Sequence, residues 1–340
     1  MKKVWAVLGM ALGLFVVLVV TLAVFGLPVG DSLAKLFQGA FGDAYGWSRT
    51  LVKTTPLLLT GIGMVIAWRA GMYNIGGEGQ FLVGGLFGAA VFAFAPAMPG
   101  PATNLAILIA CTVGGMLWAG MAGWLHVHRG VQVVICTILL NFVAIRLVGW
   151  AVSGPLQESA RQLPLTQRLP ENVMLARWNP QSDLHVGVVT AFFVALLAGW
   201  FLFRTVAGYR LRLVGESPTA ARANRIDAGR YQILAMLISG GLCGLAGGIE
   251  YTALAGQIGQ GFSQNWGFLA IPVALLGGLH PVGTIFSATY FGALFAGSEN
   301  LARFTTGGST IILVMQAVAV LGFVGLKAWA DRRVVVEEAS

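Results

Sequence analysis

Successive runs of about 20 mostly apolar residues decide what this chain can fold into. An α-helix needs roughly 20 such residues to cross the hydrocarbon core of a bilayer. Ten candidate spans meet that length: residues 4–27, 54–70, 75–95, 105–126, 131–153, 186–203, 231–250, 266–283, 284–300 and 309–330. We therefore predict an all-α, polytopic integral membrane protein with about ten transmembrane helices, in which residues 1–340 form a single transmembrane domain. The first run exceeds the ~7–15 residues of a signal-peptide core, so we expect it to be a retained helix.

The composition excludes the common soluble classes of protein. Only 10% of the residues are charged and 57% are hydrophobic, with a mean hydropathy of +0.79. Soluble domains carry about 25% charged residues, so a soluble enzyme, a disordered chain and a nucleic-acid binder are all excluded. The three cysteines lie inside apolar runs, which favours packing roles over disulfides or a metal site. The net charge is +8, and in membrane proteins an excess of basic residues usually marks the segments on the cytoplasmic side.

The distribution of Lys and Arg predicts the topology. With ten spans and the N-terminus inside, thirteen basic residues fall on the cytoplasmic side and seven on the outer side. This bias favours both termini in the cytoplasm. It makes residues 154–185, with four prolines, an outer loop and residues 204–230, with six arginines, a cytoplasmic loop.

The chain lacks the motifs that would make it an enzyme. None of its five lysines follows a glycine, so no P-loop exists to cradle ATP phosphates. It contains neither a metalloprotease H-E-x-x-H pattern nor a G-x-S-x-G nucleophile elbow. We expect no catalytic residues, no metal ligands and no bound cofactor.

The strongest positive signal is the segment from Arg69 to Gln80, RAGMYNIGGEGQ, where four glycines and several polar side chains open an apolar span. Glycines loosen a helix, and the polar side chains of Asn74 and Gln80 satisfy backbone groups at a break. A carboxylate such as that of Glu78 costs several kcal/mol at membrane depth unless it is paired. Two interpretations remain open: a structural hydrogen-bond network, or direct substrate contact and gating.

The cytoplasmic loop contains a helix start. Ser217 suits an N-cap and Pro218 the first helical position, so we predict a short helix of two to three turns over 217–226, with Asp227 capping the next span. The Ser-Pro start and the pair of alanines that follows predict a helix that docks on a partner protein. The alternative is that the arginines serve only to enforce topology.

Four segments together resemble the permease subunits of ABC importers for sugars, branched-chain amino acids and nucleosides, and the nucleoside branch most of all. They are Tyr73–Gln80 (YNIGGEGQ), Thr137–Asn141 (TILLN) followed by Gly154–Leu156 (GPL), Gly215–Arg222 (GESPTAAR) and Ala274–Gly283 (ALLGGLHPVG). The resemblance covers about residues 60–330. The chain departs from the family pattern at Tyr73, usually Phe, and at Asn224-Arg225-Ile226, where the family commonly has Ala-Gly-Ile.

The resemblance implies a vitamin-B12-type importer architecture in a bacterial inner membrane. It implies translocation of a nucleoside or related sugar-containing solute by alternating access, driven by ATP in trans. The expected partners are an ATPase with tandem nucleotide-binding domains, a second homologous permease, a substrate-binding lipoprotein and membrane lipid, but no nucleic acid.

Two sets of residues are candidates for these roles. The expected ATPase-coupling residues are Gly215, Glu216, Ser217, Pro218, Ala220, Ala221, Arg222 and Arg225, with the two alanines at the closest approach. The expected substrate-path or gating residues are Asn74, Glu78, Gln80, Asn141, Gln257, Gln260 and Trp266. Interfacial anchoring is the alternative for Trp266, because tryptophans gather at membrane surfaces.

Other functions remain open at this stage. Simple sugars or branched-chain amino acids are alternative solutes. An ion-coupled secondary transporter would use paired acids near the midplane, for which Glu78, Glu250 and Glu299 are the candidates. A membrane enzyme is a third class, without a recognisable catalytic constellation.

Overall fold

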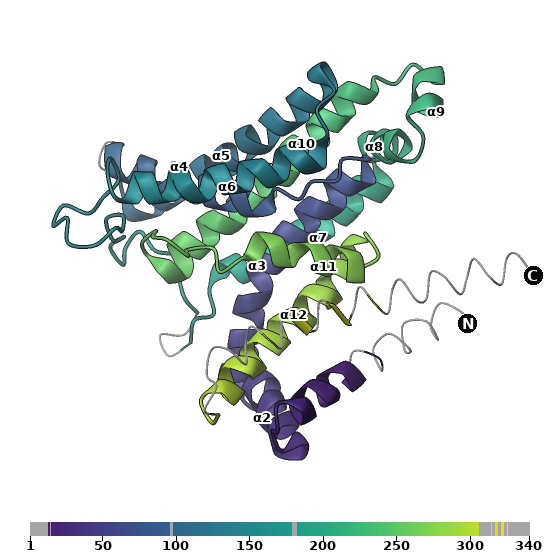
Figure 1. The fold of residues 1–340 in the computed structure, drawn as a ribbon. Coiled ribbons are helices and arrows are strands. Elements are labelled where there is room, and N and C mark those ends of the chain that lie inside the picture. The colour runs from purple at the N-terminus through teal and green to yellow at the C-terminus, as the bar shows by residue number, and fades with distance from the viewer. Residues whose placement is uncertain are drawn as a thin grey trace, which may run out of the picture. The chain divides into compact units, whose positions relative to one another are not determined.

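The computed structural model describes residues 13, 15–95, 98–178, 182–305, 314, 317–318, 321–322 and 325. It divides into two compact units, one of Thr54–Thr289 and one that combines Met1–Lys53 with Tyr290–Ser340. Within the described residues the regular structure is helical, with only isolated β-bridges between loop segments (Figure 1). The all-α prediction is confirmed.

Among the described residues, six helices are long and apolar enough to cross a membrane. They are α3 (Ala44–Arg69), α4 (Gly77–Phe94), α5 (Gly100–Arg129), α6 (Val133–Val152), α7 (Val186–Arg204) and the continuous run Ala228–Ala255, made of α10 (Ala228–Glu250) and the π-helical turn η1 (Tyr251–Ala255). They correspond to the predicted spans 54–70, 75–95, 105–126, 131–153, 186–203 and 231–250.

The predicted span 266–283 is wrong. Its helix, α11 (Trp266–Leu276), has eleven residues and is therefore only about 17 Å long, short of the ~30 Å hydrocarbon core. It stops because Gly278 and Leu279 both adopt left-handed backbone, with φ of 63° and 52°. The chain then turns into α12 (Pro281–Ala302), which covers the predicted span 284–300 as a helix but is not among the six apolar ones.

The first and last predicted spans are only partly described. Phe15–Val24 is a short apolar helix within the predicted span 4–27. Nearly all of that span before Phe15, most of 309–330 and both termini lie outside the described residues, so ten spans and two cytoplasmic termini stay predictions.

The core of the larger unit is a backbone-to-backbone contact among α4, α5 and α10. A Cβ atom on Gly115 of α5 would collide with the Gly240 carbonyl oxygen of α10, and one on Gly84 of α4 with the Gly244 Cα atom. Small residues are what allow membrane helices to approach this closely. Cys111, Cys136 and Cys243 are free and buried, as predicted for packing residues.

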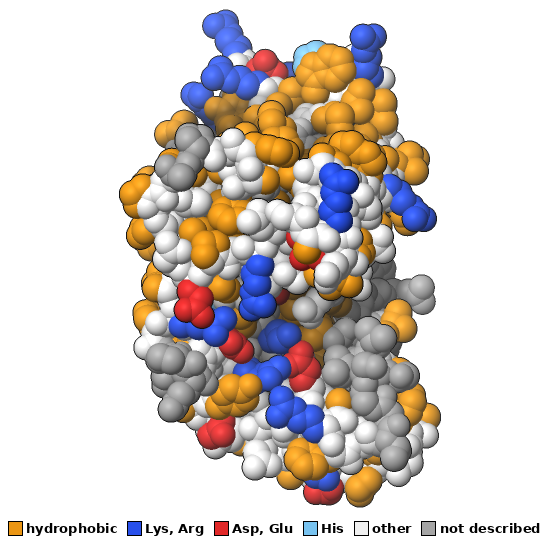
Figure 2. All heavy atoms as spheres, turned by 90° about the vertical axis from the view of Figure 1, so that its left-hand side faces the viewer, with side chains coloured by type: hydrophobic (Ala, Val, Ile, Leu, Met, Phe, Trp, Pro, Cys, Tyr) orange, Lys and Arg blue, Asp and Glu red, His pale blue; other side chains and the backbone are white. Residues whose placement is uncertain are grey.

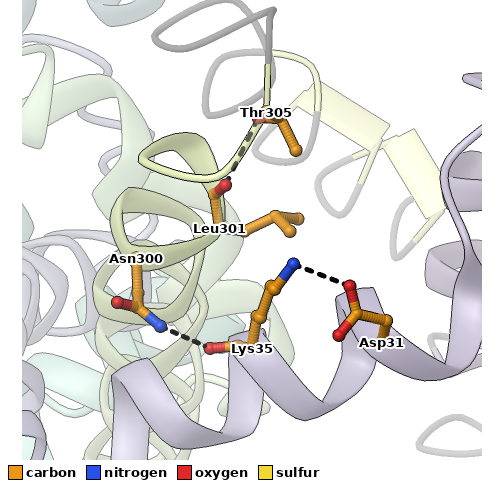
Figure 3. Close-up of polar contacts among 5 residues, drawn as sticks. All are labelled: Asp31, Lys35, Asn300, Leu301 and Thr305. Atoms are coloured by element: carbon orange, nitrogen blue, oxygen red, sulfur yellow. Dashed lines mark hydrogen bonds and ion pairs between the residues drawn. The ribbon is translucent and has the colours of Figure 1, made fainter.

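The smaller unit joins α2 (Val29–Phe41) to the end of α12. Asn300 Nδ2 donates to the Lys35 carbonyl oxygen at 2.8 Å, while Lys35 Nζ lies 2.6 Å from Asp31 Oδ2 (Figure 3). The Glu299 carboxylate pairs with Arg49 and with Lys53, whose Nζ is 2.8 Å from Oε1. Glu299 is therefore neutralised by basic residues of its own unit.

The loop 154–185 is fastened to other segments of its own unit by hydrogen bonds. The backbone N–H of Thr166 donates to the Ile258 carbonyl at 2.9 Å, and that of Leu169 to Gly256 at 2.8 Å. Asn104 Nδ2, near the start of α5, donates to the Val173 carbonyl at 2.7 Å. These bonds fasten the loop over the segment that follows η1, leaving an exposed strip that includes Arg161, Arg168 and Glu171 at its surface.

Candidate functional site

The segment between α3 and α4 is a helix break whose polar groups are satisfied inside the chain. Asn74 is fully buried and forms a side-chain pair with Gln80, with two N···O distances of 3.0 Å. The same amide accepts the Gly76 N–H at 2.8 Å and donates to Ser239 Oγ of α10 at 2.9 Å. Because every one of these groups is deeply buried, the amide network substitutes for the backbone bonds that the break interrupts.

Helix α6 supports the other side of the break. Asn141 Oδ1 accepts the Gly79 N–H at 2.8 Å, and Asn141 Nδ2 donates to the Ile75 carbonyl at 2.9 Å. Thr137 Oγ1, one turn earlier, accepts the Ile75 N–H at 3.3 Å. One amide thus replaces both a donor and an acceptor that a continuous helix would have supplied.

Glu78 links the break to α11. Its carboxylate accepts the Gly267 N–H at Oε2, 3.0 Å away, and a bond from Ser263 Oγ at Oε1. Gly267 lies in the first turn of α11, whose own N-cap residue, Asn265, makes no side-chain cap. A carboxylate at a helix N-terminus accepts hydrogen bonds from free N–H groups and interacts favourably with the positive end of the helix dipole. Glu78 therefore serves as an N-cap supplied by another helix.

The structure thus brings Asn74, Glu78, Gln80 and Asn141 together, whereas the sequence placed only the first three in one segment. Their polar atoms all bond within the chain, which favours the structural-network interpretation of this segment. Sequence analysis missed the partners Thr137, Ser239, Ser263 and Gly267. Hydroxyl and glycine residues are frequent in apolar helices, so nothing in the sequence distinguished Ser239, Ser263 and Gly267, while Thr137 was identified only as the first residue of the segment TILLN.

The remaining path candidates do not form one cluster with the break. Trp266 is 1% exposed at the start of α11, so the interfacial-anchor interpretation is wrong for this side chain. Gln260 is exposed and its Nε2 lies beside Gly149 of α6, while Gln257 is half-buried. Only Trp266, next to Gly267, adjoins the network around Glu78.

The segment 204–230 folds into two consecutive helices, α8 (Val206–Glu216) and α9 (Pro218–Ala223), separated by Ser217. Ser217 is the N-cap of α9, with its Oγ accepting the Ala220 N–H at 3.2 Å, and Asp227 caps α10 through the Arg230 N–H at 3.1 Å. Both predicted caps are confirmed.

The predicted extent of the short helix, 217–226, is wrong, because α9 ends at Ala223. The Ile226 N–H donates to the Ala221 carbonyl at 3.0 Å and the Arg225 N–H to Arg222 at 2.9 Å, which together terminate the helix. Arg225 occupies the left-handed position of this motif with φ of 56°. This is the position at which the resembling loops carry glycine.

Ala221 does not lie on the exposed face of α9. It is 0% exposed and packs within its own chain, so the expected closest approach of Ala221 to an ATPase is wrong. The exposed face is formed instead by Pro218, Thr219, Arg222 and Ala223. This end of the molecule also carries a group of Lys and Arg side chains (Figure 2).

Helix α8 lies against the turn between α3 and the helix break. A Cβ atom on Gly215, at the end of α8, would collide with the Arg69 carbonyl oxygen and lie 2.7 Å from the Gly71 nitrogen. The backbones of α8 and of this turn are therefore in direct contact. Only Met72 and Tyr73 separate Gly71 from Asn74.

Comparison with known proteins assigns this architecture. Residues 46–321 match the family described as the permease component of the branched-chain amino acid transport system. The chain is a member of that family. It is therefore a permease subunit of an ABC transporter, a transport component rather than an enzyme.

Several relatives are similar to this permease over most of its length. It is 31% identical to the guanosine ABC transporter permease protein NupP of Bacillus subtilis, over 93% of this chain and 90% of NupP. It is 28% identical to the glucose ABC transporter permease protein TsgB13 of Haloferax volcanii, over 86% and 79% of the two chains. A second B. subtilis guanosine permease protein, NupQ, is 26% identical over 72% and 78%.

One ionisable group of the permease outside its spanning helices is strongly perturbed. His185, the residue before α7, is 1% exposed. Burial, together with the nearby Arg177 guanidinium, lowers the pKa of His185 to about 4, although Asp183 opposes the shift. The imidazole is thus neutral in the folded protein near pH 7.

Proposed function

We propose that this permease is one of two homologous subunits of an ATP-driven importer in a bacterial inner membrane, and that its solute is a nucleoside. The similarity to a guanosine permease over nine-tenths of both chains supports the solute class. Two permease proteins of one organism, NupP and NupQ, both match this chain, which supports pairing with a second permease. The other partners in the proposal are an ATPase with tandem nucleotide-binding domains and a substrate-binding lipoprotein.

The observation that carries the proposal is the way α9 is fixed to the rest of the chain. Both ends of α9 are terminated by hydrogen bonds, one face is exposed, and the α8 backbone bears directly on the turn before Asn74. A push on α9 by a closing ATPase therefore reaches the helix break through a rigid contact. Because the break is held by side-chain bonds instead of a continuous backbone ladder, it is the natural place for the membrane helices to change their packing.

Coupling can be tested at the exposed face. Ala223→Glu places a carboxylate on α9 opposite the proposed ATPase cleft, where an unpaired desolvated charge typically costs several kcal/mol. We expect normal permease abundance, weak co-purification of the ATPase and loss of substrate-stimulated ATP hydrolysis. The matched control is Gln132→Glu, which adds the same group at an exposed position of the α5–α6 connection. Equal ATPase recovery with both variants would contradict the coupling role of α9.

The solute and the energy source need a transport measurement. In proteoliposomes that contain the full complex and receptor, guanosine uptake should require internal or external ATP on the ATPase side and be blocked by vanadate. Uptake that ignores ATP but stops when ionophores collapse the proton and sodium gradients would instead establish a secondary transporter.

Glucose is the second candidate solute, favoured by the similarity to TsgB13. It is tested in the same vesicles: excess unlabelled glucose should leave guanosine uptake unchanged if the permease carries nucleosides.

The exposed strip of the outer loop is the proposed contact for the receptor. Its mixed charges suit a transient, salt-sensitive docking surface. Cysteines placed at Arg168 and Glu171, both exposed, should crosslink to the receptor and lose efficiency at high salt. Crosslinks found only at positions outside 154–185 would move the docking surface elsewhere.

A further inference from the structure

The aromatic ring of Phe203, near the end of α7, is in contact with side chains from three other segments. The Phe203 ring stacks on His280, with ring centroids 4.8 Å apart and an interplanar angle of 22°. The Arg212 guanidinium carbon, from α8, lies 4.9 Å from the Phe203 centroid, and that of Arg69, at the end of α3, lies 5.9 Å away. We call Arg69, Phe203, Arg212 and His280 the Phe203 cluster.

Two hydrogen bonds from side chains to backbone carbonyls fix the cations of the cluster. Arg69 Nε donates to the Leu279 carbonyl at 2.8 Å, and Arg212 Nε donates to the Leu202 carbonyl at 3.0 Å. The first bond ties α3 to the turn between α11 and α12, and the second ties α8 to the end of α7. Leu279 has φ of 52°, an uncommon conformation for a residue with a side chain, so its surroundings must hold the turn in shape.

The cluster is held without a carboxylate. None of the four ion pairs among the described residues includes Arg69 or Arg212. Cation–π contacts and hydrogen bonds to backbone carbonyls hold the two guanidinium groups in place. A guanidinium can move across a ring face without leaving a buried anion unpaired. Such contacts suit a junction between elements that shift relative to one another.

Helix α11 runs from this cluster to the helix break. It ends at Leu276, just before the turn that carries Leu279 and His280, and its first turn is capped by Glu78. With eleven residues it is a rigid piece about 17 Å long between those two points. Ser287 Oγ of α12 also donates to the Val273 carbonyl of α11 at 2.6 Å, so the two helices are tied beyond the turn.

We propose that the Phe203 cluster is a mechanical junction between segments. When α8 and α9 move, the cluster transmits that displacement to α11, and α11 transmits it to the carboxylate of Glu78. The inference rests on the proposed coupling role of α9 and adds a second route beside the Gly215 contact. It assigns a role to Arg212 and Phe203 as positioning residues and to the short α11 as a strut. It also gives a function to the turn 277–280.

The test measures solute transported per ATP hydrolysed by the full complex in proteoliposomes. Arg212→Gln keeps a hydrogen-bond donor for the Leu202 carbonyl but removes the cation over the ring. We expect about a tenfold lower ratio of uptake to hydrolysis, with ATPase association and basal hydrolysis within roughly twofold of wild type. Arg212→Lys, which restores a cation, should recover most of the ratio.

The matched control is Arg210→Gln on the same helix, an exposed arginine whose side chain reaches only Tyr231 Oη, 3.4 Å away. It should leave the ratio unchanged. Phe203→Leu is a second variant that removes the ring while keeping an apolar side chain, and it should reproduce the loss, whereas Phe203→Tyr should not.

Two results would overturn the junction. One is a wild-type ratio in Arg212→Gln and Phe203→Leu, and the other is a loss of the ratio that is equal in Arg210→Gln. Failure of the wild-type complex to couple guanosine uptake to ATP would instead contradict the proposed function itself.

Discussion

The carboxylate of Glu78, on α4, accepts the backbone N–H of Gly267, on α11, at 3.0 Å. The two residues are 189 positions apart in the sequence, and the bond joins a spanning helix to the start of one that is too short to span. The contact requires glycine at 267, because a Cβ atom there would collide with the Glu78 backbone. Glu78 thus ties the helix break before α4 to the N-terminus of the short helix α11.

Replacing Glu78 by Gln should leave a folded permease that transports poorly. The amide keeps one oxygen for the Gly267 N–H but loses the charge that favours the N-terminus of α11, a loss of about 1–2 kcal/mol. Thermal unfolding in detergent and guanosine uptake at equal membrane abundance measure the two effects. Glu216→Gln, an exposed carboxylate at the end of α8, is the control and should match wild type in stability.

Replacing Arg225 by Gly should stabilise the end of α9. The left-handed conformation costs a residue with a side chain about 1–2 kcal/mol, and glycine adopts it freely. Hydrogen exchange of the Ile226 amide, which bonds to Ala221, should become slower. Arg222→Gly, inside the helix, should act in the opposite direction by about 1 kcal/mol. Faster exchange of Ile226 in Arg225→Gly would contradict this account of the helix end.

Replacing Gly115 by Val should prevent stable packing of α5 on α10. A Cβ atom at this position collides with the Gly240 carbonyl oxygen, so the helices must separate and lose the surrounding contacts, at a cost of several kcal/mol. Detergent size-exclusion profiles and melting temperature report the damage. Gly199→Ala in α7 is the contrast: its Cβ atom would have only Pro281 as a neighbour, at 3.7 Å, and helix propensity predicts a gain of about 1 kcal/mol.

The stability of the permease should fall as the pH is lowered from about 6.5 towards 4. The folded-state pKa of His185 is lowered to about 4 from an ordinary value of 6.5, so within this window the unfolded chain binds a proton that the folded chain excludes. The loss approaches at most about 3 kcal/mol at the acid end. His185→Phe should flatten the dependence of melting temperature on pH, and an unchanged slope would show that another group titrates.

The sequence by itself determined the class of the protein and the sites of its local punctuation. Runs of apolar residues require helices in a bilayer, since no other open structure satisfies the backbone there, and six such helices appear where predicted. Ser217, Pro218 and Asp227 act as caps because capping depends on residues within one helical turn. The polar residues of the segment 74–80 marked the helix break for the same local reason.

Only the tertiary structure decided which partners those residues have and how far each helix runs. Span 266–283 is broken by the turn 277–280, which accepts a hydrogen bond from Arg69, more than two hundred residues away, whereas hydropathy alone predicted a longer helix. Ala221 was expected to face an ATPase, but packing within the chain buries it and leaves Ala223 exposed. Burial and pairing are set by contacts between distant segments, and hydropathy along the chain carries no information about which segments meet.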